Sequence, residues 1–222
     1  MKKISVISAV YNAEECLEEL IKQIKFNLKK YTKQIEIILV NDYSADNSWL
    51  RMLRLKKKNK CLKIYNLKKN FGQHYAFRYG AKKATGEKIF FLDCDLEHHP
   101  RFFSKFLNNY NPNNIIVGKY DLSSTINKGL VSNIFWLLYS LLTFKNHLFI
   151  SNYILIPKVV LKKLVQKKKI TYLYQDLISL NFDVTNVSFK RMKRFKGTSS
   201  YTYLKLIKLA FALIKNRINL LQ

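Results

Sequence analysis

Four strand-like apolar segments alternate with helical patterns along the first half of the chain. They read KISVISAV (3–10), IEIILV (35–40), LKIYNL (62–67) and KIFFLD (88–93), with helical patterns at about 13–31, 45–58 and 74–84 between them. This alternation predicts parallel strands joined by crossover helices. Because the segments are almost uninterrupted apolar runs, helices are expected on both faces of the sheet. The sequence therefore predicts an α/β fold with a mostly parallel central sheet.

Polar side chains follow three of these segments at the point where each one ends. They are, in chain order, Tyr11 and Asn12, Asn41 and Asp42, and Asp93 and Asp95. In open α/β sheets, ligands bind outside the carboxyl ends of the strands. We therefore expect a polar binding site at this edge of the sheet.

After Pro100 the regular alternation stops. The expected elements are a helix at about 101–110, a strand at 114–120, an apolar helix at 129–144, an apolar run at 147–157, a basic helix at 158–169, a helix at 172–180, a strand at 183–192 and a closing helix at 203–214. The chain has no internal repeat and no low-complexity linker. We expect one continuous domain whose second half is both basic and apolar.

Basic residues dominate the charge, with 40 Lys and Arg against 14 Asp and Glu and a formal net charge of +26. This excess predicts an anionic partner, which is nucleic acid, an anionic membrane face or a phosphorylated substrate. The alternative is a general lysine bias, in which runs such as KKK at 56–58 are solvated helix ends. Three unpatterned cysteines predict a reducing compartment without a disulfide framework.

The apolar stretches of the chain do not predict a membrane span. The apolar segment at the N-terminus is followed by polar Asn12 and Glu14 and has no small-residue cleavage site. We therefore expect a strand there and no signal peptide. The longest, 129–144 and 203–214, fall short of the ~20 residues that a spanning helix needs. The closing helix is basic and amphipathic, a pattern that fits either a membrane interface or packing on the domain.

Asp93 and Asp95 form the strongest candidate for a metal site. Two carboxylates at the end of a buried strand suit Mg²⁺ or Mn²⁺, which take a few hard oxygens from protein and the rest from phosphate and water. A solvated strand end is the plain alternative. Zinc is the rival because Cys94, His98 and His99 are near, but strand alternation turns Cys94 away and no second Cys or His pair has zinc-like spacing.

The motifs around these strand ends resemble family 2 glycosyltransferases. The matching segments are VISAVYNAEECL (6–17), VNDYSADNS (40–48) and NFGQHYAFRYGAKKATGEKIFFLDCDL (70–96), and RFKGTSSY (194–201) is similar to the R-x-x-G-x-S-x-Y element of the polyprenyl-phosphate sugar transferase branch. The resemblance implies the GT-A fold. It also implies metal-dependent transfer of a sugar from a nucleoside-diphosphate sugar, with inversion at the anomeric carbon.

The resemblance assigns roles to residues of this chain. It implies that the nucleotide-sugar pocket involves Tyr11, Asn12, Glu14, Asp42, Gly72, Gln73, Asp93, Lys119 and Ser199. In this assignment Asp42 meets the base or ribose, and Asp93 and Asp95 hold the metal ion against the diphosphate. The catalytic candidates are Asp95, Arg194 and Asp176. Arg194 would lie over the phosphates, which suits a fork-shaped guanidinium.

Five positions depart from the family pattern. Ala13 replaces the usual acidic residue, Glu97 replaces glutamine, Lys119 replaces arginine, and His98 and His99 follow where relatives have other residues. These departures leave open a degenerate member that binds nucleotide without turnover. A basic nucleic-acid-binding protein is a further alternative, although no recognised nucleic-acid motif occurs.

The resemblance also divides the chain by role. Residues 1–120 would form the nucleotide-sugar-binding half, and 121–222 the acceptor-binding half with amphipathic, membrane-proximal helices. The expected acceptor is a lipid-linked one, a polyprenyl phosphate or a lipid-linked or surface glycan of the cell envelope. The protein would then lie on the inner face of the cytoplasmic membrane as a peripheral protein. The alternative is a saccharide hydroxyl acceptor with Asp176 as the base, or Asp176 as a mere helix-surface carboxylate.

Overall fold

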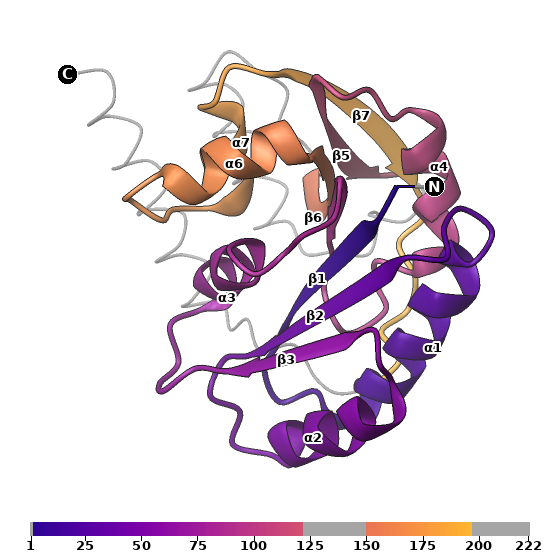
Figure 1. Ribbon diagram of the computed structural model, residues 1–222, viewed down its shortest axis with the longest axis vertical. Helices are drawn as coiled ribbons and strands as arrows, with labels where there is room; N and C mark the ends of the chain where they lie inside the picture. Colours follow the sequence, from indigo (N-terminus) through magenta and orange to yellow (C-terminus); the bar gives the residue numbers. More distant parts are fainter. Residues whose placement is uncertain (1, 122–149, 197–222) are drawn as a thin grey trace.

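The computed structural model describes residues 2–121 and 150–196, and these contain a single seven-stranded sheet (Figure 1). The strands are β1 (Ile4–Val10), β2 (Ile35–Asn41), β3 (Leu62–Asn66), β4 (Lys88–Phe91), β5 (Asn114–Tyr120), β6 (Ile150–Pro157) and β7 (Asp183–Phe189), in the order β3-β2-β1-β4-β6-β5-β7. Strands from both halves of the sequence thus belong to one sheet. The expected helices at 129–144 and 203–214 lie outside the described residues.

Helices cover both faces of this sheet, as the apolar strands predicted (Figure 1). One face carries α1 (Leu17–Leu28), α2 (Ser48–Lys58) and α4 (Phe103–Asn108), and the other carries α3 (Gln73–Ala81), α6 (Lys158–Gln166) and α7 (Leu173–Ile178). Two 3-10 turns, η1 (Glu14–Cys16) and η2 (Pro100–Phe102), precede α1 and α4. Successive strand residues alternate between the two cores, with Phe90 in the first and Phe91 in the second. The expected α/β architecture is confirmed.

The strand β6 runs against both of its neighbours. The pairs β1–β2, β1–β4, β2–β3 and β5–β7 are parallel, whereas β6 is antiparallel to β4 and to β5. In the β4–β6 register, Phe91 at the carboxyl end of β4 faces Ile154. The amino-terminal residues of β6 therefore reach the edge of the sheet where β4 runs into Asp93.

A buried carboxylate lies at the amino-terminal ends of the strands, on the side of the sheet opposite the expected site. Glu36, at the start of β2, is 2% exposed and lies 2.7 Å from the Lys63 ammonium. Ser5 donates a hydrogen bond to it at 2.5 Å, and the Thr85 N–H donates another at 2.9 Å. These partners tie the amino ends of the strands together, far from the strand ends where the site was expected.

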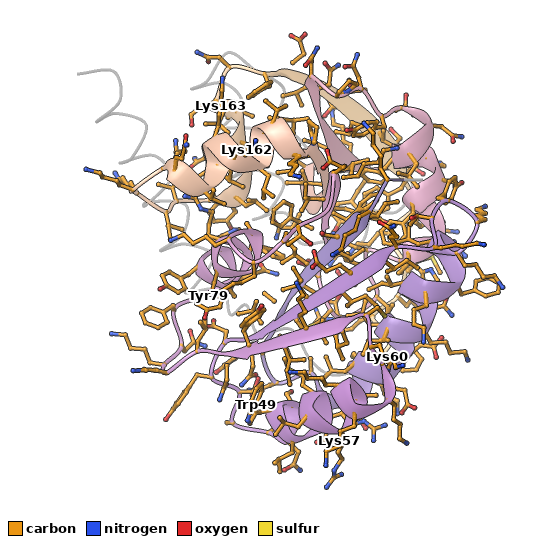
Figure 2. The ribbon with its side chains drawn as sticks, viewed as in Figure 1. Trp49, Lys57, Lys60, Tyr79, Lys162 and Lys163 are labelled. Carbon is orange, nitrogen blue, oxygen red and sulfur yellow. The ribbon has the colours of Figure 1, made fainter. Side chains whose placement is uncertain are left out.

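Lysines occupy separate outer surfaces of the described part. Figure 2 shows Lys57 and Lys60 at one end of the molecule, by α2, and Lys162 and Lys163 on α6 at the other. Lys57, Lys162 and Lys163 are on exposed helix faces and Lys60 is in the exposed turn after α2, so this spread fits solvated side chains. Within residues 2–121 and 150–196, no helix is long and apolar enough to cross a membrane.

Candidate functional site

Asp93 is held by side chains from two other elements. Its Oδ1 atom accepts a hydrogen bond of 2.6 Å from Nε2 of Gln73, the first residue of α3. The Gln73 Oε1 atom in turn accepts one of 3.3 Å from Asn152 of β6. The Asp93 backbone N–H donates to Nδ1 of His98 at 3.2 Å. Residues from α3 and β6 thus lie around the Asp93 carboxylate.

Asp95 lies beneath a segment from the end of the described chain. Its Oδ2 atom is 3.0 Å from Nη2 of Arg194, and its Oδ1 atom accepts the Glu97 N–H at 3.0 Å. The Phe195 N–H also donates to the Asp95 carbonyl at 3.0 Å. We call residues 191–196 the strap, because they cross the loop that carries both aspartates. The strap brings Arg194 to the acidic pair.

Glu97 joins the strap to the same loop through ion pairs. Its carboxylate contacts the Arg191 guanidinium and lies 3.6 Å from Nε of Arg194. The Met192 N–H donates to the Glu97 carbonyl at 3.2 Å. Arg191 also lies over the ring of Tyr120, 5.1 Å from its centroid. Glu97, a departure from the family pattern, therefore has two charged partners.

The acidic pair has the electrostatics of a cation site. Burial, with a smaller contribution from the charge of Glu97, raises the pKa of Asp93 to about 6. Burial and the neighbouring charges of Asp93 and Glu97 likewise raise the pKa of Asp95 to about 6. A divalent cation would relieve this repulsion, and oxygen-only ligands suit Mg²⁺ or Mn²⁺.

The geometry disfavours zinc at this position. Cys94 faces away as expected, because its side chain belongs to the hydrophobic core between the sheet and α1. His98 is 1% exposed, with Nδ1 bonded to the Asp93 N–H and Nε2 2.6 Å from the Tyr120 hydroxyl. Burial lowers the pKa of His98 to about 4, so it is neutral at pH 7. In the described ranges, no three His, Cys, Asp or Glu are grouped to hold a metal ion by themselves.

The loops after β1 and β2 bond to each other beside this pair. The Asn12 backbone has φ 49, its Oδ1 atom accepts the Ala45 N–H at 2.8 Å, and its own N–H donates to Ser44 Oγ at 3.0 Å. The Glu14 N–H donates to Asp46 Oδ2 at 3.2 Å. Tyr11 leaves 38% of its surface exposed.

Asp42 shapes the loop that precedes α3. Its two carboxylate oxygens accept the N–H groups of Phe71 and Gly72, each at 2.8 Å. Gly72 has φ 91 and ψ 156, a conformation that favours glycine, and Gln73 follows it directly. Asp42 therefore fixes the approach of Gln73 to Asp93, in addition to the base or ribose contact that the resemblance implies.

The remaining candidates lie in other surroundings. Asp176 of α7 is 1% exposed and pairs with Arg78 at 3.5 Å, so the expectation of a helix-surface carboxylate was wrong. Thr171 Oγ1 donates to Asp176 at 2.8 Å. Lys119 lies on β5, paired in register with Ile150. Ser199 lies outside the described residues.

Two residues of the site, Asn152 and Arg191, were not predicted from the sequence. Asn152 comes from an apolar run, and only the reversed direction of β6 brings it to Gln73. Arg191 is one of several basic residues in KRMKR at 190–194, and its contacts with Glu97 and with the Tyr120 ring distinguish it. A polar residue interrupting an apolar strand was the available signal for Asn152.

Known proteins resemble this chain in sequence. A family model described as Glycosyl transferase family 2 matches residues 5–185. A Mycobacterium tuberculosis (strain CDC 1551 / Oshkosh) protein described as a glycosyltransferase is 31% identical over 104 residues, which are 47% of this chain. The chain spans only 30% of that relative's length.

Solved structures share the fold at low identity. Glucosyl-3-phosphoglycerate synthase from Mycobacterium tuberculosis, in complex with Mn²⁺, UDP and phosphoglyceric acid, matches with a TM-score of 0.68 and 15% identity, over 96% of this chain and 76% of its own. The mannosyltransferase PcManGT from Pyrobaculum calidifontis, in complex with GDP-mannose and Mn²⁺, matches with a TM-score of 0.56 and 13% identity, over 87% and 58%. These matches concern the fold.

Proposed function

Because this chain belongs to glycosyl transferase family 2, we propose that it transfers a sugar from a nucleoside-diphosphate sugar to a lipid-linked acceptor. The reaction would depend on Mg²⁺ or Mn²⁺ and proceed with inversion at the anomeric carbon. The observation that carries the proposal is the acidic pair, Asp93 and Asp95, whose raised pKa values and oxygen ligands fit a hard cation. Two structural neighbours were solved with Mn²⁺ and UDP or GDP-mannose.

The metal ion, when bound, would neutralise the diphosphate that leaves with the nucleotide. Asp93 and Asp95 would hold it, and Gln73 would orient Asp93 through the hydrogen bond of 2.6 Å. Arg194, already in contact with Asp95, would place a second positive charge where negative charge develops. The hydrogen bond from Gln73 to Asp93 and the ion pair of Arg194 with Asp95 support these proposed roles.

The loops after β1 and β2 would bind the nucleotide. The side chains of Asn12 and Asp42 accept hydrogen bonds from backbone N–H groups of neighbouring loops. These bonds would hold the wall of the nucleotide pocket in place before the donor binds. The partly exposed ring of Tyr11 offers a surface for the base. Glu14 and Lys119 remain candidates for contacts with the donor.

An ionised acceptor suits this site better than a hydroxyl. A hydroxyl acceptor needs a carboxylate base within reach of its proton, and Asp176 was the candidate. Burial at 1% exposure and pairing with Arg78 support a structural role for Asp176 instead. A lipid phosphate is already an anionic nucleophile at neutral pH and needs no base. The proposed place of action is the inner face of the cytoplasmic membrane, where basic residues add roughly 1 kcal/mol each near an anionic surface.

The proposal is tested by turnover. Purified protein is incubated with UDP-, GDP- and dTDP-sugars, Mn²⁺ and undecaprenyl phosphate in detergent, and release of the nucleoside diphosphate is measured. We expect release with one donor, abolished by EDTA and by Asp95→Ala. Release that needs a saccharide acceptor and not the lipid phosphate would overturn the acceptor assignment. Release unaffected by EDTA would overturn the metal-dependent mechanism.

A further inference from the structure

The ion pairs of the strap converge on one carboxylate that the proposed reaction does not use. Glu97 is 12% exposed, contacts Arg191 and lies 3.6 Å from Nε of Arg194. The same Arg194 guanidinium lies 3.0 Å from Asp95. A guanidinium has five N–H donors in a planar fork, so it can serve both carboxylates at once. Arg194 therefore stands between a proposed metal ligand and a second acidic residue.

Binding of a divalent cation at Asp95 changes this balance. A bound cation would repel the Arg194 guanidinium, and the two would compete for the Oδ2 atom of Asp95. An ion pair with another carboxylate would favour a position of the displaced guanidinium beside the site. Glu97 supplies that anion at a distance already within the range of an ion pair.

The position of Glu97 is itself fixed from three sides. Its backbone N–H donates to Asp95 Oδ1, and its carbonyl accepts the Met192 N–H. Arg191, which contacts its carboxylate, is in turn held over the Tyr120 ring. Movement of Arg194 away from Asp95 would leave these contacts in place.

We propose that Glu97 is a positioning residue that keeps the Arg194 guanidinium beside the metal site after the metal ion has taken Asp95. The guanidinium is then available to the diphosphate oxygens bound to the same ion. This inference rests on the proposed function. It gives a physical role to the glutamate that departs from the family's glutamine, since a neutral amide cannot balance two guanidinium charges.

The test compares binding of Mn²⁺ alone with binding of the Mn²⁺–pyrophosphate complex, both by isothermal titration calorimetry. Pyrophosphate carries the diphosphate without requiring the correct base. The variants are Glu97→Gln, Arg194→Gln and the double variant. The matched control is Glu87→Gln, which breaks the 2.7 Å ion pair with Lys158 before β4, at the other edge of the sheet.

The expected result is a coupled loss. Glu97→Gln weakens binding of the Mn²⁺–pyrophosphate complex about tenfold, the scale of one charge-assisted hydrogen bond. Arg194→Gln weakens binding of the complex similarly but leaves Mn²⁺ alone bound at least as tightly, because a competitor for Asp95 is gone. In the Arg194→Gln background, Glu97→Gln weakens binding of the complex no more than binding of Mn²⁺ alone, which loses only the attraction of the Glu97 charge. The Glu87→Gln control binds like the wild type.

Other outcomes separate the inference from the function on which it rests. Losses that multiply in the double variant, or a Glu97→Gln protein that binds the complex like the wild type, would overturn the role of Glu97 while the metal site stands. If Glu97→Gln does not fold, Arg194→Gln still tests the proposal. Equally weakened binding of Mn²⁺ and of the Mn²⁺–pyrophosphate complex in this variant would contradict the idea that the ion displaces Arg194 from Asp95. A wild-type protein that binds neither ligand would contradict the proposed function itself.

Discussion

Gln73 donates a hydrogen bond of 2.6 Å to Asp93, and this bond connects the start of α3 to the end of β4. Asp42 accepts the Gly72 N–H and so fixes the loop before Gln73. Asn152 donates a hydrogen bond to the side-chain Oε1 atom of Gln73. Orientation of the first proposed metal ligand thus depends on residues from the loop after β2, from α3 and from β6. Support of this kind commonly changes metal affinity when it is removed.

Substitution of Gln73 should therefore weaken metal binding. We expect Gln73→Ala to lower the affinity for Mn²⁺ by about 10- to 100-fold, because Asp93 loses its orienting donor. Calorimetric titration with Mn²⁺ measures this. The matched control is Gln23→Ala, which removes a similar 2.7 Å bond to Glu19 on α1. Equal Mn²⁺ affinity in wild type and Gln73→Ala would contradict the role of this bond.

Loss of the Asp42 carboxylate should destabilise the fold. Asp42 is 2% exposed, and Asp42→Asn replaces one of its two acceptor oxygens with an amide N–H donor, so the N–H of Phe71 or Gly72 loses its acceptor, at a cost of about 1–3 kcal/mol. Urea denaturation measures the change in the free energy of unfolding. In the control Asp46→Asn, an exposed carboxylate also loses one of two backbone donors, but water can replace it. Similar losses in the two variants would refute the argument from burial.

Asp176 should matter for stability more than for turnover. Asp176→Asn leaves the buried Arg78 charge without its anion, and we expect a loss of about 3 kcal/mol in the free energy of unfolding. Turnover per folded molecule should stay near that of the wild type. Asp183→Asn, at an exposed position of β7, serves as the control. A stable Asp176→Asn protein with abolished turnover would reinstate Asp176 as a base.

Glu36 should make the fold sensitive to acid. Burial alone would raise the pKa of Glu36, but hydrogen bonds from Lys63, Ser5 and Thr85 lower it to about 2. Because this pKa lies below the ordinary value of 4.5, the carboxylate stabilises the fold above pH 4.5. The contribution, about 3 kcal/mol, is lost as the pH falls from 4.5 toward 2.

The measurement is the free energy of unfolding of wild type and Glu36→Gln across this pH range. The difference between the two proteins should shrink as the pH falls. The control Glu18→Gln removes an exposed partner of Arg51 and should give a small difference at every pH. A difference for Glu36→Gln that is constant between pH 5 and pH 2 would contradict the lowered pKa.

The sequence predicted the parts of the molecule that depend on local pattern. The four apolar segments became β1 to β4, and the helical periods between them became α1, α2 and α3. Because parallel strands end at one edge, the same pattern placed Asp42 and Asp93 together. The helix expected at 13–31 begins instead as a 3-10 turn and ends at Leu28, since periodicity locates helix ends poorly.

Features that depend on distant pairing were not predictable. The direction of β6, and with it the place of Asn152, follows from pairing with β4 and β5 across a long connection. Nothing local marks Arg191 as the partner of Glu97. Asp176 is buried against Arg78 of a different helix, and the residues around Asp176 in the sequence do not indicate this pairing.

The central claim is that Asp93 and Asp95 hold a divalent cation against the diphosphate of a sugar nucleotide. Its most direct test is thermal unfolding of wild type and Asp95→Asn with UDP, GDP, dTDP and CMP, each with and without Mn²⁺, since a ligand of the folded state raises the melting temperature. We predict that one nucleoside diphosphate stabilises the wild type only with Mn²⁺, and that Asp95→Asn loses this effect. Stabilisation that is independent of Mn²⁺, or that persists in Asp95→Asn, would contradict the account.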